Sequence, residues 1–183
     1  MEPFTVLIDP GHGGKDPGAG EVEAKINLRI ALILSDLLQC HFPVWMTRTA
    51  DRATVSLTER ARYEHDLRPA LTVSIHCNAA ENPTAHGFEV FTSIGETAAD
   101  RAACCIIHEI QNAFPRRRLR YDLTDGDLDK EAEFWMLRKT IGPAVLIECG
   151  FVSHPEERDW LLQAETQRAL AEAIAAGILR WRS

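Results

Sequence analysis

Three side chains that can bind a metal ion or transfer a proton stand at or just beyond the ends of short apolar runs. They are His12, His76 and Glu148. Each run is of the kind that forms a buried strand. If these strands are parallel, their carboxyl ends meet at one edge of the sheet, where open α/β sheets bind ligands. We therefore predict that the three residues lie close together although they are far apart in the chain.

A fourth residue, Glu23, begins a helical pattern soon after the glycine-rich loop that contains His12. A helix that packs back on the sheet brings its N-terminus to the same edge. Two imidazoles and one carboxylate, with a water in the fourth position, form a typical catalytic zinc centre. Glu148 is then a second carboxylate, suited to act as a general base.

Other interpretations of these residues stay open at this point. Glu21 lies close enough in sequence to be the ligand in place of Glu23, and Glu23 can instead interact with the positive end of the helix dipole. His76 can be a hydrogen-bonded histidine of the core. Glu148 is harder to explain structurally, because an acidic residue that closes an apolar run is seldom buried without a partner.

The elements that must position these residues alternate along the chain. Predicted strands cover residues 4–8, 43–47, 71–75, 87–92, 134–137 and 144–147. Predicted helices cover residues 23–40, 97–114, 156–162 and 165–181, and a further helix begins with a capping box from Ser56 to Glu59. This alternation predicts an α/β fold with a single domain over residues 1–183, built on a twisted, mostly parallel sheet with helices on both faces.

Composition narrows the classes of partner. The net charge of −7 argues against a nucleic-acid-binding protein, and no apolar run is long enough to cross a bilayer. Residues 1–20 lack the apolar core of a signal peptide, so we expect the chain to be made in the cytoplasm. The five cysteines are odd in number, irregularly spaced and without a CxxC pair, which favours buried thiols over disulfides or a thiolate zinc site.

Several motifs, in order along the chain, resemble those of the zinc-dependent N-acetylmuramoyl-L-alanine amidases of the family 3 type. The five matching segments are residues 7–14 with 16–18, Glu23 with Asn27 and Leu28, the stretch of Thr47-Arg48 with Asp51 followed by Leu57 with Arg60, residues 74–79, and residues 143–151 with Glu156. The register of the second motif favours Glu23 over Glu21. One such motif is weak evidence, but five in order over nearly the whole chain are strong evidence.

The resemblance implies a fold, a site and a reaction. It implies one Zn²⁺ per chain, with His12, Glu23 and His76 as ligands and Glu148 as the catalytic acid and base. The substrate it implies is peptidoglycan or a muropeptide, and the reaction is hydrolysis of the amide that joins N-acetylmuramic acid to L-alanine. Asn78 and Arg138 are the residues that we expect to contact the substrate. We also expect a monomer.

Two other functions remain to be separated from this one. The chain could be another zinc peptidase or amidohydrolase, or a catalytically silent wall-binding module, although the intact set of four residues weighs against the last. Residues 91–134 show no long extra helix of the kind that blocks regulated cell-division amidases. The sequence is therefore similar to a bare catalytic domain, as in a phage or prophage lysin that reaches the wall after release or export. Cys77 and Cys149, which follow two of the site residues, are expected to point away from the metal.

Overall fold

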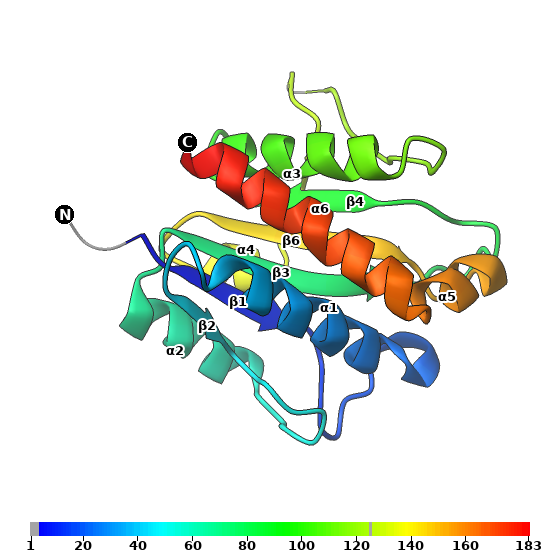
Figure 1. Cartoon of the computed structure of the whole chain (residues 1–183), viewed down its shortest axis with the longest axis horizontal. Helices are drawn as coiled ribbons and strands as arrows, with labels where there is room; N and C mark the ends of the chain where they lie inside the picture. Colours follow the sequence, from blue (N-terminus) through cyan, green and yellow to red (C-terminus); the bar gives the residue numbers. More distant parts are fainter. Residues whose placement is uncertain (1–3, 125) are drawn as a thin grey trace.

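The computed structural model describes residues 4–124 and 126–183, and its centre is one six-stranded sheet. In chain order the strands are β1 (Val6–Pro10), β2 (Val44–Met46), β3 (Leu71–Asn78), β4 (Glu89–Thr92), β5 (Lys130–Glu131) and β6 (Ala144–Phe151). The helices are α1 (Glu23–Leu38), α2 (Leu57–Leu67), α3 (Asp100–Ala113), α4 (Trp135–Lys139), α5 (Pro155–Leu161) and α6 (Ala164–Arg182), with a short 3₁₀ helix at Ala19–Glu21. Figure 1 shows these elements along the chain.

The strands lie in the order β2-β1-β3-β6-β4-β5. β2, β1, β3 and β6 are parallel, whereas β4 runs antiparallel to β6 and carries β5 parallel to itself at the edge. The predicted α/β fold with a mostly parallel sheet is therefore confirmed. Among the described residues, no helix is long and apolar enough to span a membrane.

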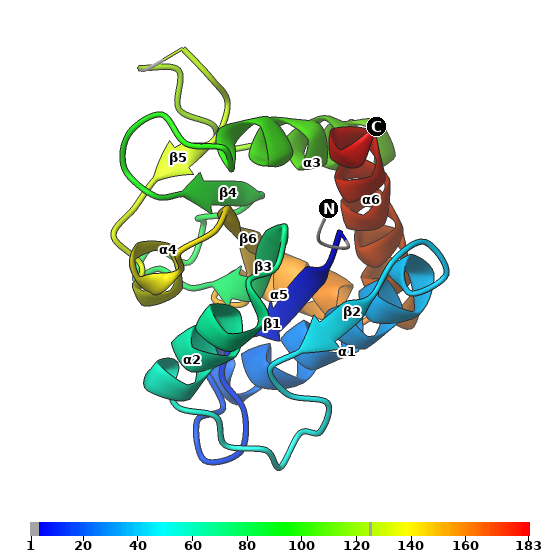
Figure 2. The same ribbon diagram turned by 90° about the vertical axis from the view of Figure 1, so that its left-hand side faces the viewer.

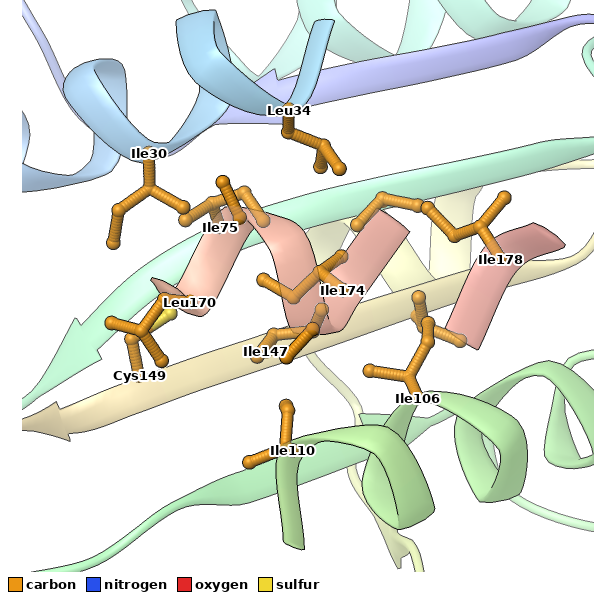
Figure 3. Packing of buried hydrophobic residues seen from close by; sticks show 14 of the residues in the cluster. Ile30, Leu34, Ile75, Ile106, Ile110, Ile147, Cys149, Leu170, Ile174 and Ile178 are labelled. Atoms are coloured by element: carbon orange, nitrogen blue, oxygen red, sulfur yellow. The ribbon is translucent and has the colours of Figure 1, made fainter. Parts of the chain in front are cut away.

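One face of the sheet is apolar and is covered by α1, α3 and α6, while α2 and α4 lie on the other side (Figure 2). Because side chains alternate along a strand, every second residue of β3 and β6 points to this apolar face. Figure 3 shows Ile75, Ile147 and Cys149 packed there against isoleucines and leucines of the three helices. The burial of Cys77 and Cys149 in this core confirms that both thiols point away from the other face.

The opposite face, which we call the site face, is polar toward the carboxyl ends of β1, β3 and β6. It carries the intervening residues Asp9, Ser74, His76 and Glu148. A small second core of Phe91, Leu137, Ala144 and Leu146 fills its other part, under α4. The sheet therefore separates the main hydrophobic core from the polar residues that carry chemistry.

The structure corrects the prediction for residues 134–137, which form the start of helix α4 and not a strand. A run of four apolar residues has no resolvable period, so a strand and a helix cannot be told apart from it. In the helix, Met136 and Leu137 are buried against the site face, and Arg138 and Lys139 are exposed. The short strand β5 was not predicted, because two residues carry no alternation.

The predictions for two strands were right in kind but too short. β3 and β6 continue beyond residues 75 and 147, so that His76 and Glu148 lie within the strands and not just beyond them.

The capping box predicted at the start of α2 is confirmed, with both of its hydrogen bonds present. The Ser56 hydroxyl accepts from the Glu59 amide, and the Glu59 carboxylate accepts from the Ser56 amide.

A buried ion pair joins α2 to the end of β1. The guanidinium of Arg60 donates to the Asp9 carboxylate, and both side chains are almost fully buried. Arg60 also donates to the carbonyl oxygens of Pro10, at 2.8 Å, and of His12, at 2.6 Å. Burial alone would raise the pKa of Asp9, yet the charge of Arg60 and the hydroxyl of Thr47 hold that pKa below its usual value. The pair therefore fixes the course of the chain that leads into His12.

We predict that Arg60→Ala lowers the free energy of unfolding by about 3–5 kcal/mol, because it leaves the Asp9 carboxylate buried without its cation. The exposed Arg62, which pairs with Asp66 on the same helix, provides the control, and Arg62→Ala should change stability by less than about 0.5 kcal/mol. Urea denaturation of the three proteins measures both effects. Equal losses for the two variants would show that the buried pair has no special role.

Candidate active site

The loop that follows β1 places His12 at the carboxyl edge of the sheet. His12 has a left-handed backbone conformation, with φ of 60°, and is followed by two glycines of positive φ. The buried guanidinium of Arg48 holds this loop by donating to the carbonyl oxygens of Pro10, at 3.0 Å, and Gly11, at 2.8 Å. A Cβ atom on Gly11 would lie 2.2 Å from the His76 imidazole, so only glycine lets the loop approach that ring so closely.

Three potential metal ligands meet beside this loop, as the sequence predicted. One carboxylate oxygen of Glu23, Oε1, lies 3.1 Å from Nε2 of His12 and 3.1 Å from Nδ1 of His76. The ligand atoms of the three residues all lie within 4.8 Å of one another. Glu23 stands at the first turn of α1, which brings it to the sheet edge, whereas Glu21 is exposed in the short 3₁₀ helix before it.

Neighbouring groups fix the orientation of these ligands. Nδ1 of His12 lies 2.8 Å from the Asp16 carboxylate, which leaves Nε2 to face Glu23. The second carboxylate oxygen of Glu23 accepts a hydrogen bond from the Ala19 amide at 2.7 Å. A carboxylate behind a histidine ligand is the usual arrangement in metal centres, because it sets the tautomer and the ring orientation.

The three donors are strongly coupled through charge. Burial would raise the pKa of Glu23, but hydrogen bonds from both imidazoles keep it well below its usual value. The hydrogen bond to Glu23 raises the pKa of His12 to about 9, against the opposing effect of burial. The pocket thus favours positive charge at its centre. Two imidazole nitrogens and one carboxylate oxygen in this arrangement fit a divalent zinc ion.

Glu148 lies beside this cluster on the neighbouring strand. It is the register partner of His76 across β3 and β6 and is only 8% exposed. Its Oε2 atom is buried and has no hydrogen-bond partner among the residues that the structure describes. Burial raises the pKa of Glu148 to about 7, and the charges of Glu23 and Glu89 act in the same direction, against that of His76. A carboxyl group that titrates near neutral pH, with a free oxygen, is suited to accept and return a proton.

The two predicted substrate residues have different outcomes. Asn78 lies two residues beyond His76 on β3, and its amide donates to Oε2 of Glu89 at 2.6 Å. Arg138 lies on the exposed end of α4, with its guanidinium 5.8 Å from the centre of the Trp135 ring. The structure therefore brings Asn78 to the site, and Arg138 stays a predicted substrate residue on an exposed helix end.

Glu89 is a residue of this region that the sequence analysis did not identify. It lies directly opposite Glu148 in the antiparallel pair of β4 and β6, and it is 3% exposed. Its signal was present in the sequence. In the alternating run from Gly87 to Thr92, a glutamate is an unexpected residue for a strand that is buried throughout.

A cavity of about 380 Å³ opens on the other side of the donors, toward α2. Its lining includes His12, His76, Ser56, Leu57 and Met136. Polar site residues thus form one wall of this cavity, and the N-terminus of α2 and the side of α4 form others. Space for a substrate therefore exists directly beside the candidate metal ligands.

Comparison with known proteins supports one family. A family model described as N-acetylmuramoyl-L-alanine amidase (Amidase_3) matches residues 6–180. The chain is 34% identical over 182 residues to the amidase CwlM of Bacillus licheniformis, covering 96% of this chain and 67% of that protein. It is 32% identical over 177 residues to an endolysin of Bacillus phage SPP1, covering 94% of this chain and 64% of that protein.

A solved structure gives the same result in three dimensions. The amidase AmiC2 of Nostoc punctiforme superposes with a TM-score of 0.86 at 32% identity, covering 98% of this chain and 97% of that one. The chain thus spans about two thirds of the length of the two curated relatives and nearly all of this solved domain. The matched region includes the whole His12, Glu23, His76 and Glu148 constellation. The chain belongs to the N-acetylmuramoyl-L-alanine amidase family, the enzymes that hydrolyse the amide between N-acetylmuramic acid and L-alanine in peptidoglycan.

Proposed function

We propose that His12, Glu23 and His76 hold one zinc ion per chain and that Glu148 is the acid and base of peptidoglycan amide hydrolysis. The observation that carries this proposal is the buried, unpartnered oxygen of Glu148 on the strand next to the three donors. A bound zinc supplies a Lewis acid that polarises a carbonyl and lowers the pKa of a water molecule. The protein supplies the remaining chemistry through its own side chains.

Glu148 first acts as a base and then as an acid. Its free oxygen accepts the proton of the attacking water, and the same oxygen returns that proton to the leaving amine of L-alanine. Its raised pKa suits both steps, because near neutral pH the group gains and loses a proton at little cost. Asp16 keeps the His12 ring in place, and Arg48 and Arg60 hold the loop on which that ring stands.

The setting in which the chain acts is part of the same proposal. All four residues come from one chain, so a monomer is sufficient for the reaction. Residues 1–183 act as one catalytic domain, and the substrate is peptidoglycan or a muropeptide. The enzyme reaches the wall after release or export from the cytoplasm. Mass spectrometry of digested peptidoglycan separates this function from that of another zinc peptidase, because only the amidase yields free stem peptides together with peptide-free glycan.

The metal assignment predicts the behaviour of single ligand variants. Purified protein should contain about one zinc per chain, and zinc should raise its melting temperature, since a ligand that binds the folded state stabilises it. His12→Ala, Glu23→Ala and His76→Ala should each lose most of the zinc and of this thermal shift. His86→Ala, at an exposed histidine, is the control and should retain both. Full zinc content in all three ligand variants would show that the assignment is wrong.

A second prediction separates Glu148 from the ligands. Glu148→Gln keeps the shape of the side chain but cannot accept a proton, so kcat should fall by about 10²- to 10⁴-fold. Zinc content and melting temperature should change little. Glu156→Gln, at an exposed glutamate of α5, should leave kcat unchanged. Turnover on purified muropeptide and elemental analysis give the two readouts. Loss of zinc in Glu148→Gln would make Glu148 a ligand, and normal turnover would exclude it as the base.

A further inference from the structure

Glu89 forms ion pairs with two cationic side chains next to the proposed base. Its Oε1 atom accepts from Nε of Arg120 at 3.0 Å and from Nζ of Lys130 at 2.7 Å. Its Oε2 atom accepts from Asn78. The carboxylate of Glu89 is 4% exposed, whereas the side chains of Arg120 and Lys130 are 30% and 29% exposed. Two cations thus lie above one buried anion, and the cluster has one surplus positive charge.

Backbone pairing with β4 places both cations at this point of the sheet. The segment at Arg120 pairs with the start of β4, where the Arg120 amide donates to the Phe88 carbonyl at 2.9 Å. Lys130 lies in β5, where it pairs with Phe91 of the same strand β4. The chain therefore leaves the edge of β4 after Arg120 and returns to it at Lys130, and both side chains turn inward to Glu89.

These cations retain free hydrogen-bonding capacity. In the described part of the chain, the two terminal nitrogens of Arg120 have no hydrogen-bond acceptor, and Lys130 uses one bond, to Glu89. Each of the two cations also lies near an aromatic ring. The Arg120 guanidinium lies 5.3 Å from the ring centre of Phe151, and the Lys130 ammonium lies 5.3 Å from that of Phe91. A carboxylate at the surface can thus meet both cations.

The proposed reaction tells which part of the substrate lies here. Glu148 returns a proton to the leaving amine, so the departing peptide lies on the Glu148 side of the donors. In strand order that side leads from β6 to β4 and β5. The cavity on the opposite side, toward α2, is left for the sugar.

The distance from Glu148 to this cluster indicates that the second residue of the stem peptide reaches it. Neighbouring strands lie about 4.8 Å apart, and an extended residue spans about 3.3–3.6 Å. One to two strand spacings beyond Glu148 therefore correspond to the residue after L-alanine. In stem peptides this is a D-glutamyl residue joined through its γ-carboxyl group, so its α-carboxyl group is free, either as a carboxylate or as an amide.

The geometry points to a carboxylate subsite in which Arg120 and Lys130, positioned by Glu89, bind the α-carboxylate of that D-glutamyl residue. The subsite makes the enzyme select stem peptides that carry the carboxylate over those that carry the amide. Glu89 is a positioning residue here, because it acts through the two cations. This inference rests on the proposed function, which orients the substrate.

The test compares two soluble muropeptides that differ only in this α-carboxylate or α-amide. Wild-type enzyme should show a kcat/KM about ten- to a hundredfold higher for the carboxylate substrate, the range of a charge-assisted hydrogen bond. Arg120→Gln and Lys130→Met should each reduce this ratio strongly, mainly by slowing the carboxylate substrate. Lys130→Arg, which keeps the charge, should preserve most of the ratio. Arg118→Gln changes an exposed arginine of the same segment and should leave the ratio unchanged.

Because the readout is a ratio between substrates, a general loss of stability does not imitate it. Equal kcat/KM for the two substrates in the wild type would overturn the subsite. So would variants that slow both substrates by the same factor, since that result indicates a purely structural role. Wild-type enzyme that cleaves neither substrate would instead refute the proposed function, and the subsite with it.

Discussion

The buried pair of Asp9 and Arg60 is the interaction on which the site depends most. It is made between the end of β1 and the first turns of α2, and it also reaches the carbonyl of His12. Thr47 and Ser74 also donate to the Asp9 carboxylate, so both of its oxygens accept hydrogen bonds from side chains. A buried ion pair often adds little net stability when compared with apolar residues of similar volume. Here its hydrogen bonds hold the path of the loop that carries His12.

The alternation of side chains along the strands explains why a small domain can hold so many charged groups. The main apolar core uses only one face of the sheet, under α1, α3 and α6. The site face is then free to carry His76, Glu148 and Glu89 in a row across three strands. The reversal of β4 matters for this row, since it brings the first residue of that strand, and not the last, to the functional edge.

Local sequence patterns predicted the strands and helices whose residues show a clear apolar run or a helical period. Apolar runs located β1, β3 and β6, and the spacing of isoleucines and leucines located α1. His76 and Glu148 were identifiable because polar residues interrupt such runs. The position of Glu89 beside Glu148 was not identifiable in this way, since it depends on strand pairing, and its contact with Lys130 spans 41 residues. Helix α4 was not recognised, because its run of four apolar residues has no resolvable period.

The chain between Arg120 and Lys130 leaves and rejoins the same edge of β4, and both ends are tied to one carboxylate. Its length is therefore not set by the sheet. The entropy of closing a loop grows only slowly with the number of residues, so extra residues here would disturb the strands very little. This stretch is accordingly a place where the fold can accept an inserted segment, and any such segment would emerge close to Glu89 and Glu148. An insertion at this position could therefore regulate the site without changing the sheet or the helices that cover it.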